Sequence, residues 1–528
     1  MRKFAIHRTS CVVAVTVLLL VAVAAFAQDA QNPPLRVNVS NQFSSSATSG
    51  RLLVFISKRH RKQLGPQLGS GTIDYWVLAK EVRNLSATST ADFWPDAQAF
   101  PSSAASIPPG DYYVQAILDA NHNYAYNTHP DGGDLVSPVV RTKVNAGKTV
   151  QVELASRVPA APVKTPRGSE PLDFVSPSLS AYHGREIHMR GFVVLPPSYQ
   201  ANTSQTYPIV YVTLGFTAEL VHVAETAEER FKAMEKGDAP EMIYAVLDQS
   251  TAWGTHEFAD SLTNGPWGKA LTSELVPYIE NKYRTDARPS SRFLTGHSSG
   301  GWSSIWLQTA YPDVFGGAWP TAPDPVDFRS FVGIDLTKDR NMYRRADGTA
   351  RPLMRLKGKV VETIEGYSRL ERVLGEYGGQ MRSFEAVFSP RGEDSQPEEL
   401  YDRDTGEINP EVVRYWERYD VSAMLRKNWA NVGPKVSGKI HLVVGDVDNF
   451  YLEESASLLQ QTLSELGGAA CFEYVAHRDH INLYSGNDLA NRIAREMYAV
   501  ARPPQGVAQN ASACPKPYVS TLKTVTAD

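Results

Sequence analysis

Short runs of β-branched and aromatic residues mark the first part of the chain, with Gly, Pro, Ser and Asn between them. The clearest runs are 52–56, 112–118 and 150–154, and none of them shows helical periodicity. Such spacing predicts a small all-β, sandwich-like accessory domain over residues 36–155. Three prolines follow within 156–170, where they disfavour both a helix and a central strand, so we expect a linker there.

Beyond the linker, buried-type strands alternate with helical segments in which apolar residues lie three or four positions apart. We expect strands at 207–215, 242–248, 292–295, 440–444 and 471–475, and helices at 267–283, 302–310, 452–466 and 489–497. This alternation is typical of a largely parallel sheet flanked by helices. We therefore predict an α/β catalytic domain over residues 171–500, followed by a C-terminal tail at 501–528.

One long stretch interrupts this alternation. Residues 325–437 are rich in charge and poor in strand signals, with a helix expected at 358–377 and a turn at 402–406. The stretch is too long for a plain connection inside a domain. We interpret it as a lid insertion.

The N-terminal segment predicts export. Three basic residues precede the apolar run 11–26, which ends at the small-residue pattern before residue 28. The alternative is a permanent membrane anchor, but the run is shorter than the roughly 20 residues that a spanning helix needs. We therefore expect a signal peptide at 1–27, a secreted or periplasmic mature protein and no membrane span after cleavage.

The charge of the chain narrows the classes of partner. The formal net charge is −4, and cleavage of the signal peptide would remove three basic residues and no acidic one. An acidic protein of this kind is poorly suited to the phosphate backbone, which argues against a nucleic-acid partner. Two cysteines would remain, Cys471 and Cys514, and an even number in an exported protein predicts one disulfide between them.

The motif at 296–301, Gly-His-Ser-Ser-Gly-Gly, carries the strongest chemical signal. It contains G-x-S-x-G directly after an expected strand and before an expected helix, as in the nucleophile elbow. The tight strand-to-helix turn projects a serine clear of the sheet, and the flanking glycines are needed because a Cβ would clash across the turn. We predict Ser298 as the nucleophile.

An acid and a histidine should follow the elbow in that order, each in a loop after a later strand. Asp446 and Asp448 follow the strand at 440–444, and the alternation of strand side chains cannot choose between them beyond Gly445. Of the two histidines after the strand at 471–475, His480 lies farther out in the loop than His477, so we favour His480 as the base.

Three further features concern ligands. An oxyanion needs two backbone N–H donors, which we assign to Ser299 and Phe216, with Gly215 as the alternative to Phe216. No cofactor is required, and a metal site at His477 and His480 would need helical geometry that the preceding strand denies. The accessory domain holds five oxygen-bearing side chains that could surround Ca²⁺ or simply form a polar hairpin: Asp119, Asn121, Asn123, Asp131 and Asp134.

The catalytic half resembles an esterase family of α/β-hydrolases that includes siderophore, feruloyl and acetylxylan esterases, S-formylglutathione hydrolases and mycolyl transferases. The matching pieces are 194–199, 207–211, 265–268, the elbow, 445–451 and 478–480. The resemblance implies an α/β-hydrolase fold, ester hydrolysis and Asp448 as the acid, because the family's acid commonly precedes an aromatic pair. The family commonly has His where this chain has Leu214, and this change leaves the backbone donor of the loop in place.

Three hypotheses follow for the function. The first is an exported serine esterase that forms an acyl-enzyme on Ser298 and acts on a small-molecule or polysaccharide-linked ester. The second is an acyltransferase that uses the same three residues. The third is a non-catalytic exported binding protein. In this third hypothesis, residues 36–155 are the recognition part. Separately, we expect residues 36–155 to form a separable domain that supplies no catalytic group.

Overall fold

The structure is a computed structural model that describes residues 34–43, 47–66, 75–145, 148–375 and 377–503. The expected signal peptide, nearly all of the expected tail and Cys514 lie outside these residues, so export and the Cys471–Cys514 disulfide stay predictions. None of the helices in the described ranges is long and apolar enough to cross a membrane.

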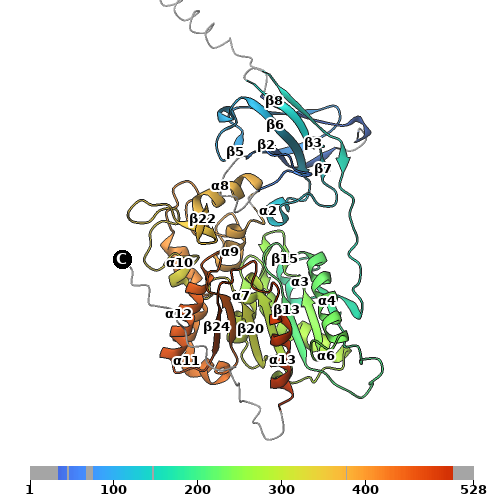
Figure 1. Ribbon diagram of the computed structural model, residues 1–528, viewed down its shortest axis with the longest axis vertical. Helices are drawn as coiled ribbons and strands as arrows, with labels where there is room; N and C mark the ends of the chain where they lie inside the picture. Colours follow the sequence, from blue (N-terminus) through green and yellow to red (C-terminus); the bar gives the residue numbers. More distant parts are fainter. Residues whose placement is uncertain (1–33, 44–46, 67–74, 146–147, 376, 504–528) are drawn as a thin grey trace, which may run out of the picture.

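Two packed sheets form the accessory domain (Figure 1). The smaller sheet has the order β4-β1-β9, and the larger has the order β10-β7-β6-β2-β3-β5 with β8 paired to β6. The strands are β1 (Leu35–Val39), β2 (Thr48–Ser57), β3 (Tyr75–Leu85), β4 (Thr90–Phe93), β5 (Gln98–Phe100), β6 (Gly110–Asp119), β7 (Leu135–Val136), β8 (Val140–Val144), β9 (Val150–Leu154) and β10 (Ser156–Arg157). The predicted sandwich is confirmed, and its three clearest runs lie in β2, β6 and β9.

Strand β2 is apolar on both faces because both faces are covered. Leu52, Val54 and Ile56 belong to the core between the two sheets. Leu53 and Phe55 point the other way and join a second cluster that includes helix α8 (Ile364–Leu374) of the predicted lid. Because strand side chains alternate between faces, one uninterrupted apolar run therefore serves two interfaces.

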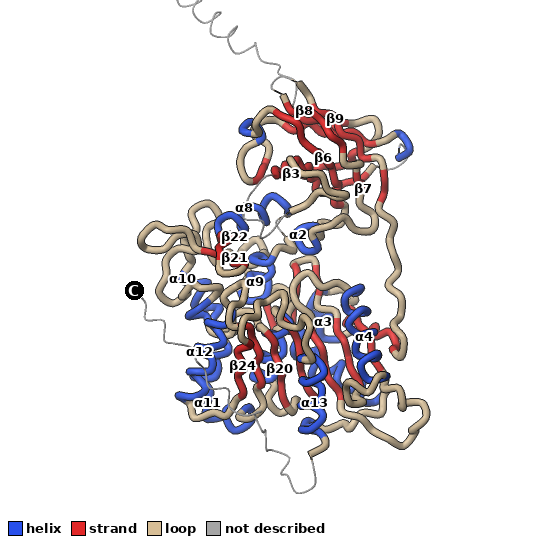
Figure 2. The backbone as a smooth tube through the Cα atoms, in the orientation of Figure 1, coloured by secondary structure: helices blue, strands red, loops and turns tan. Residues whose placement is uncertain are grey.

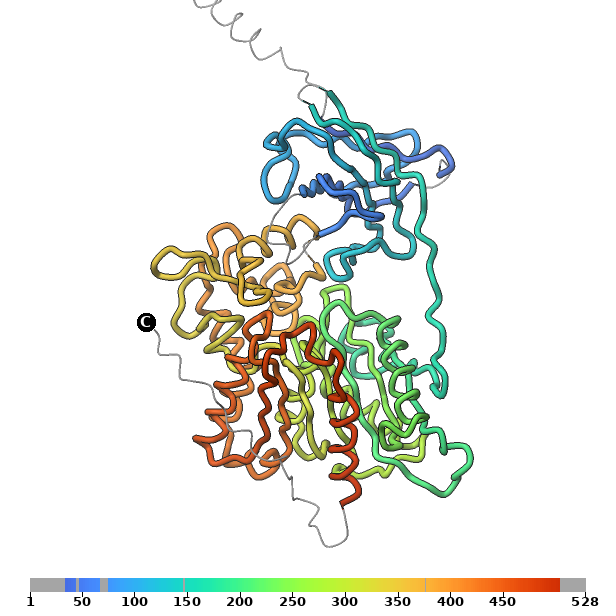
Figure 3. The backbone as a smooth tube through the Cα atoms, in the orientation of Figure 1, coloured from blue at the N-terminus to red at the C-terminus, as the bar shows by residue number. Residues whose placement is uncertain are grey.

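Residues 158–168 run along one side of the molecule and connect the sandwich to the catalytic sheet (Figure 3). This eight-stranded sheet has the order β11-β12-β14-β13-β19-β20-β23-β24. Strand β12 is antiparallel to both neighbours, and the six strands from β14 to β24 pair in parallel. The strands are β11 (Ser169–Val175), β12 (His188–Val194), β13 (Ile209–Thr213), β14 (Ile243–Leu247), β19 (Arg292–His297), β20 (Gly317–Thr321), β23 (His441–Gly445) and β24 (Cys471–Val475).

Helices pack against this sheet (Figure 2), as the α/β-hydrolase prediction requires. For example, α4 contacts β12 and β14, and α7 contacts β19 and β20. The helices are α3 (Pro177–His183), α4 (Leu220–Glu235), α5 (Trp267–Ala270), η3 (Leu271–Leu275), α6 (Val276–Lys282), η4 (Pro289–Ser291), α7 (Ser299–Ala310), α11 (Val421–Val436), α12 (Leu452–Glu465) and α13 (Leu489–Ala501). Two short hairpins, β15 (Ser250–Thr251) with β16 (Gly254–Thr255) and β17 (Asp260–Ser261) with β18 (Gly265–Pro266), precede α5.

The expected lid differs from its prediction in two ways. Its elements are η5 (Phe328–Ser330), β21 (Pro352–Leu356), β22 (Lys359–Thr363), α8, α9 (Gln380–Phe388) and α10 (Pro410–Trp416). The helix predicted at 358–377 begins only at Ile364, because 359–363 pair with β21 and the Thr363 hydroxyl then accepts the Gly366 N–H at 3.0 Å. Helix α11 lies within the predicted range 325–437 but packs against α7 and α12, so it belongs with the helices of the sheet.

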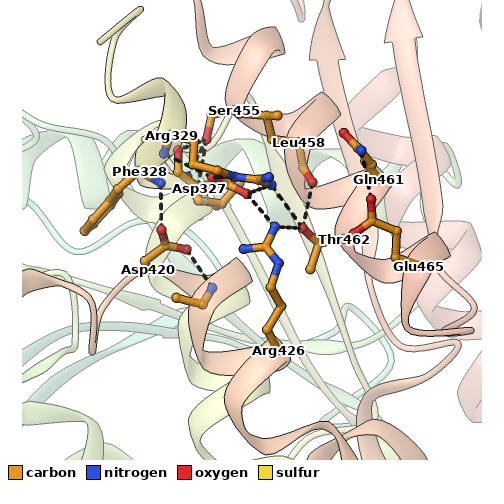
Figure 4. A network of polar contacts seen from close by, with 12 residues as sticks. Asp327, Phe328, Arg329, Asp420, Arg426, Ser455, Leu458, Gln461, Thr462 and Glu465 are labelled. Carbon is orange, nitrogen blue, oxygen red and sulfur yellow. Dashed lines mark hydrogen bonds and ion pairs between the residues drawn. The ribbon is translucent and has the colours of Figure 1, made fainter. Parts of the chain in front are cut away.

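A polar network fixes the chain where it leaves the sheet for the lid (Figure 4). Asp327 is fully buried, and its carboxylate accepts two hydrogen bonds from the guanidinium of Arg329, at 2.9 and 2.7 Å. Burial alone would raise the pKa of Asp327, but its hydrogen bonds, chiefly those of Arg329, outweigh burial and lower it. Arg426 of α11 also approaches Asp327, and both arginines reach Thr462 of α12. The segment is thereby held to two helices of the catalytic domain.

Arg51 of the accessory domain joins that domain to the lid. Its side chain is buried, and its guanidinium donates to the carbonyl oxygens of Val373, at 3.0 and 2.8 Å, and Arg372, at 3.2 Å. Both carbonyls lie in the last turn of α8, where a helix leaves its acceptors without partners and carries partial negative charge. A cation from the other domain therefore caps α8.

We expect Arg51→Met to loosen α8 while the methionine keeps most of the apolar contact. Hydrogen bonds from a charged group contribute about 2 kcal/mol, so amide exchange in 364–374 should accelerate by roughly thirtyfold. The matched control is Arg36→Met, which breaks the part-exposed Arg36–Asp92 ion pair inside the accessory domain and should leave that exchange unchanged. Equal protection of α8 in the wild type and in Arg51→Met would contradict the role given to Arg51.

Candidate active site

Ser298 lies at the turn between β19 and α7 in a strained backbone conformation, with φ 59° and ψ −125°. The turn is tight because backbones meet across it. A Cβ on Gly300 would lie 2.2 Å from the carbonyl oxygen of Thr213, and a Cβ on Gly296 would lie 2.2 Å from that of Gly300. Only glycine fits at these two positions, as the motif predicts, and the serine is presented at the carboxyl edge of the sheet.

His480 and Asp448 are in contact. The Nδ1 atom of His480 lies 3.0 Å from Oδ2 of Asp448, which is fully buried and also accepts the Phe450 N–H at 2.8 Å. Burial lowers the pKa of His480, but the charge and hydrogen bond of Asp448 outweigh it, with a further contribution from the charge of Asp324, so that the pKa is raised overall. The structure thus brings the favoured histidine to the acid that the family resemblance implies.

The alternative acid and the alternative histidine meet elsewhere. Asp446 accepts the backbone N–H of His477 at 2.7 Å, and His477 itself is exposed with φ 59°. Both residues thus stabilise the turns that carry Asp448 and His480. In this position Asp446 is a turn residue that binds backbone, as short acidic side chains commonly do.

The expected oxyanion donors lie on both sides of Ser298. Ser299 is the first residue of α7, where a helix leaves its N–H without an intrahelical partner. Gly215 lies against the nucleophile, since a Cβ there would be 3.2 Å from the Ser298 Cβ. Phe216 follows Gly215 and lines a cavity that Ser298 also lines. The loop after β13 therefore approaches Ser298 closely enough for Gly215 or Phe216 to serve as the second donor.

Asp324 is a site residue that the sequence analysis missed. Its side chain is buried, and its carboxylate accepts the Ser299 hydroxyl at 2.6 Å and the Ser298 hydroxyl at 3.3 Å. Burial raises the pKa of Asp324 to about 6 despite these hydrogen bonds. It follows β20, a strand that the sequence analysis also missed, and recognition of that strand would have singled out an acid at its carboxyl end.

A cavity of about 300 Å³ opens beside Ser298 and His480. Its wall comes from the loop that carries Phe216, from the lid through α8 and α9, and from the accessory domain through Ala125 and Thr128. The accessory domain thus shapes the cavity. Of its described residues that line the cavity, only Thr128 carries a polar side-chain group, a hydroxyl. Its separation from the site is therefore smaller than the linker suggested.

The short helix α2 (Tyr124–Asn127) brings the accessory domain to the cavity. Asp119 accepts the N–H groups of Asn123 and Tyr124, at 3.2 and 3.0 Å, which fixes the start of α2. Tyr126 then donates its hydroxyl to the Ala218 carbonyl at 2.7 Å and packs edge-on against Phe216, with ring centroids 5.0 Å apart. The accessory domain thereby touches the loop of an expected oxyanion donor.

The five oxygen-bearing residues considered for Ca²⁺ hydrogen-bond to one another and to nearby backbone. Asn123 donates to Asp131 at 2.8 Å, and Asp134 accepts the N–H groups of Ala120 and Asp131. Within the described ranges, no group of three or more His, Cys, Asp or Glu side chains is placed to hold a metal ion. The hairpin interpretation accounts for these contacts, since they position α2.

Comparison with known proteins identifies the family of this chain. The sequence profile of the family described as "Putative esterase" matches residues 180–487. The chain belongs to this family. That match covers the β13 loop, the elbow, Asp448 and His480, and it leaves the accessory domain outside.

Individual relatives are more distant. The protein YbbA of Bacillus subtilis (strain 168) is 31% identical over 132 residues, which is 23% of this chain and 51% of that relative. The chain thus spans about half the length of this curated relative. An S-formylglutathione hydrolase from Agrobacterium tumefaciens is 16% identical, with 63% of this chain and 97% of that chain covered and a TM-score of 0.39. A ferulic acid esterase is 17% identical, with 63% and 100% covered and a TM-score of 0.35.

Proposed function

We propose that the protein is an exported serine esterase that hydrolyses carboxylic esters through an acyl-enzyme on Ser298. The observation that carries the proposal is the 3.0 Å contact of His480 with buried Asp448, at the cavity that Ser298 also lines. A nucleophile and a base at one cavity, with an orienting acid in contact with the base, are the parts that acyl transfer needs. No cofactor is required for this chemistry.

The contact with Asp448 indicates which ring nitrogen of His480 carries the proton. An ionised carboxylate only accepts hydrogen bonds, so Nδ1 of His480 carries the proton and Nε2 keeps a free lone pair. Nε2 takes the proton of Ser298 as its oxygen attacks the ester carbonyl, and later gives that proton to the leaving alcohol. Water then attacks the acyl-enzyme by the same route, which regenerates the serine and releases the acid.

The serine must turn before it reacts. Its hydroxyl donates to Asp324 at 3.3 Å in the structure, a long hydrogen bond that costs little to break. Attack requires the hydroxyl to face His480 instead, and catalytic hydrogen bonds commonly tighten only when substrate is bound. The N–H groups of Ser299 and of Phe216 or Gly215 then hold the oxyanion.

An acyltransferase would use the same residues and differ only in the acceptor. Its substrate would be an alcohol that outcompetes water, and product analysis with and without glycerol or sugar acceptors separates the two activities. The expected substrates of the esterase are small-molecule or polysaccharide-linked esters, and the N-terminal segment supports export to a secreted or periplasmic location.

A fluorophosphonate probe should label the wild type and should not label Ser298→Ala. The probe reacts with a serine only when that serine is activated, so labelling reports the assembled site rather than the mere presence of a hydroxyl. The Ser303→Ala variant, which removes a buried hydroxyl of α7, serves as control and should retain labelling. A folded wild type that resists the probe would favour the non-catalytic binding protein.

The two aspartates after β23 should behave differently. Asp448→Asn should lower kcat by roughly 10³ to 10⁴ with little change in KM, because His480 would be held in the wrong tautomer. Asp446→Asn, the matched control in the same loop, should cost less than about tenfold, since the amide oxygen can still accept the His477 N–H and only the local geometry changes. The reverse order would move the role of the acid to Asp446.

The charge of Asp324 should influence the pH dependence of kcat/KM. His480 accepts a proton only when neutral, so kcat/KM rises with pH through its pKa, which the charges of Asp448 and Asp324 raise. Asp324→Asn removes one of these charges, which makes the imidazolium less stable and should move the acid limb of the kcat/KM profile to lower pH. A limb that stays in place or moves to higher pH would show that Asp324 does not act on His480 in this way.

A further inference from the structure

The cavity beside Ser298 is lined by acidic side chains and by no Lys or Arg among the described residues. Two carboxyl groups, Asp324 and Glu362, line it, and none of the described lining residues is Lys or Arg. The rest of the wall is largely apolar, with four aromatic side chains: Phe216, Tyr367, Phe384 and Phe450. Such a cavity repels an anionic ligand and attracts a cation, since aromatic faces and carboxylates both favour positive charge.

Of the two carboxyl groups that line the cavity, Asp324 is the one in contact with Ser298. It contacts the hydroxyls of Ser298 and Ser299 directly, and its side chain is only 6% exposed. No Lys or Arg in the described part of the chain forms an ion pair with it. A buried carboxylate that no Lys or Arg neutralises acts strongly on whatever enters the cavity, as it does on His480, because little water screens its charge.

This position opposes catalysis on a neutral ester. A carboxylate next to the nucleophile destabilises the negative oxygen that forms during attack. A positive charge on the substrate would offset that effect, because both the Asp324 carboxylate and the developing oxyanion would attract it. Its effect on the oxyanion therefore favours a substrate that brings its own cation.

Glu362 supports the same interpretation from the lid. It is the penultimate residue of β22, is half-buried, and accepts the N–H of Thr363 at 2.9 Å. Gln380 of α9 also lines the cavity, and its buried amide nitrogen has no hydrogen-bond partner within the described structure. The cavity thus keeps polar groups for a ligand at two places away from Ser298.

We propose that this cavity selects esters that carry a protonated amine or a quaternary ammonium group, and that Asp324 is the residue that determines this specificity. The proposal rests on the proposed ester hydrolysis at Ser298 and names its substrate class. A volume of about 300 Å³ fits a small group, so the cation belongs to a short amino-acyl or amino-alcohol part of the ester.

Two pairs of isosteric esters test the selection. In the acyl pair, the 4-nitrophenyl esters of 3-aminopropanoic and butanoic acid differ by an ammonium in place of a methyl group. In the alcohol pair, butyrylcholine and 3,3-dimethylbutyl butyrate differ by a charged nitrogen in place of a carbon. The Ser298→Ala variant supplies the uncatalysed background. We expect kcat/KM to favour the cation by about tenfold or more in at least one pair, and the 4-nitrophenyl ester of succinic acid to be the poorest acyl substrate.

Asp324→Asn should remove most of that preference, by about tenfold, because the amide keeps the size and the Ser299 hydrogen bond but loses the charge. The matched control is Glu365→Gln, three residues beyond Glu362 on the lid, where the carboxylate pairs with Arg344 and Arg369 and does not line the cavity. It should leave every ratio unchanged.

Each outcome decides the proposal. Equal or faster turnover of the neutral ester in both pairs by the wild type would overturn it, even if Asp324→Asn failed to fold. A preference that survives unchanged in folded Asp324→Asn would overturn the role of that residue. Failure of the proposed esterase function is distinguishable, since it would abolish fluorophosphonate labelling and the turnover of all esters alike.

Discussion

The site depends on how closely the loop after β13 and the start of α7 approach each other. The backbone of Gly300 meets the carbonyl of Thr213 at a distance that no Cβ could occupy. This contact forces the chain into the strained turn at Ser298, and the rigid parallel sheet maintains the strain. The other active-site residues lie where neighbouring strands end at the same edge: Asp324 after β20, Asp448 after β23 and His480 after β24. One steric constraint and one sheet edge thus account for the assembly of the site.

The local pattern of the sequence was sufficient to predict the strands and helices whose apolar residues follow a simple periodicity. The run at 150–154 coincides with β9, and the helix expected at 452–466 is α12. The elbow could be predicted because glycine spacing, strand and helix are all local. Strand alternation could not choose between Asp448 and Asp446 as the partner of His480, because beyond Gly445 the backbone turns, and Asp448 was expected only from the family resemblance.

What the sequence analysis missed depends on contacts between distant parts of the chain. Strand β20 has the sequence Gly-Ala-Trp-Pro-Thr, whose glycine and proline are typical breakers, and the strand exists because β19 pairs with it in parallel. Asp324 was missed with it. The approach of α2 to Phe216 joins segments about ninety residues apart, and neither segment carries a local signal of the other.

The attachment of α8 to β2 has a consequence for the order of folding. Leu53 and Phe55 find their partners in residues 364–374, more than three hundred positions later in the chain. Domains generally fold in the order in which they are synthesised, so the sandwich forms first and exposes this apolar face until the later segment arrives. A nascent chain of this protein therefore exposes an apolar sheet surface through most of its synthesis. A chaperone that shields such surfaces would act on the first domain rather than on the catalytic one.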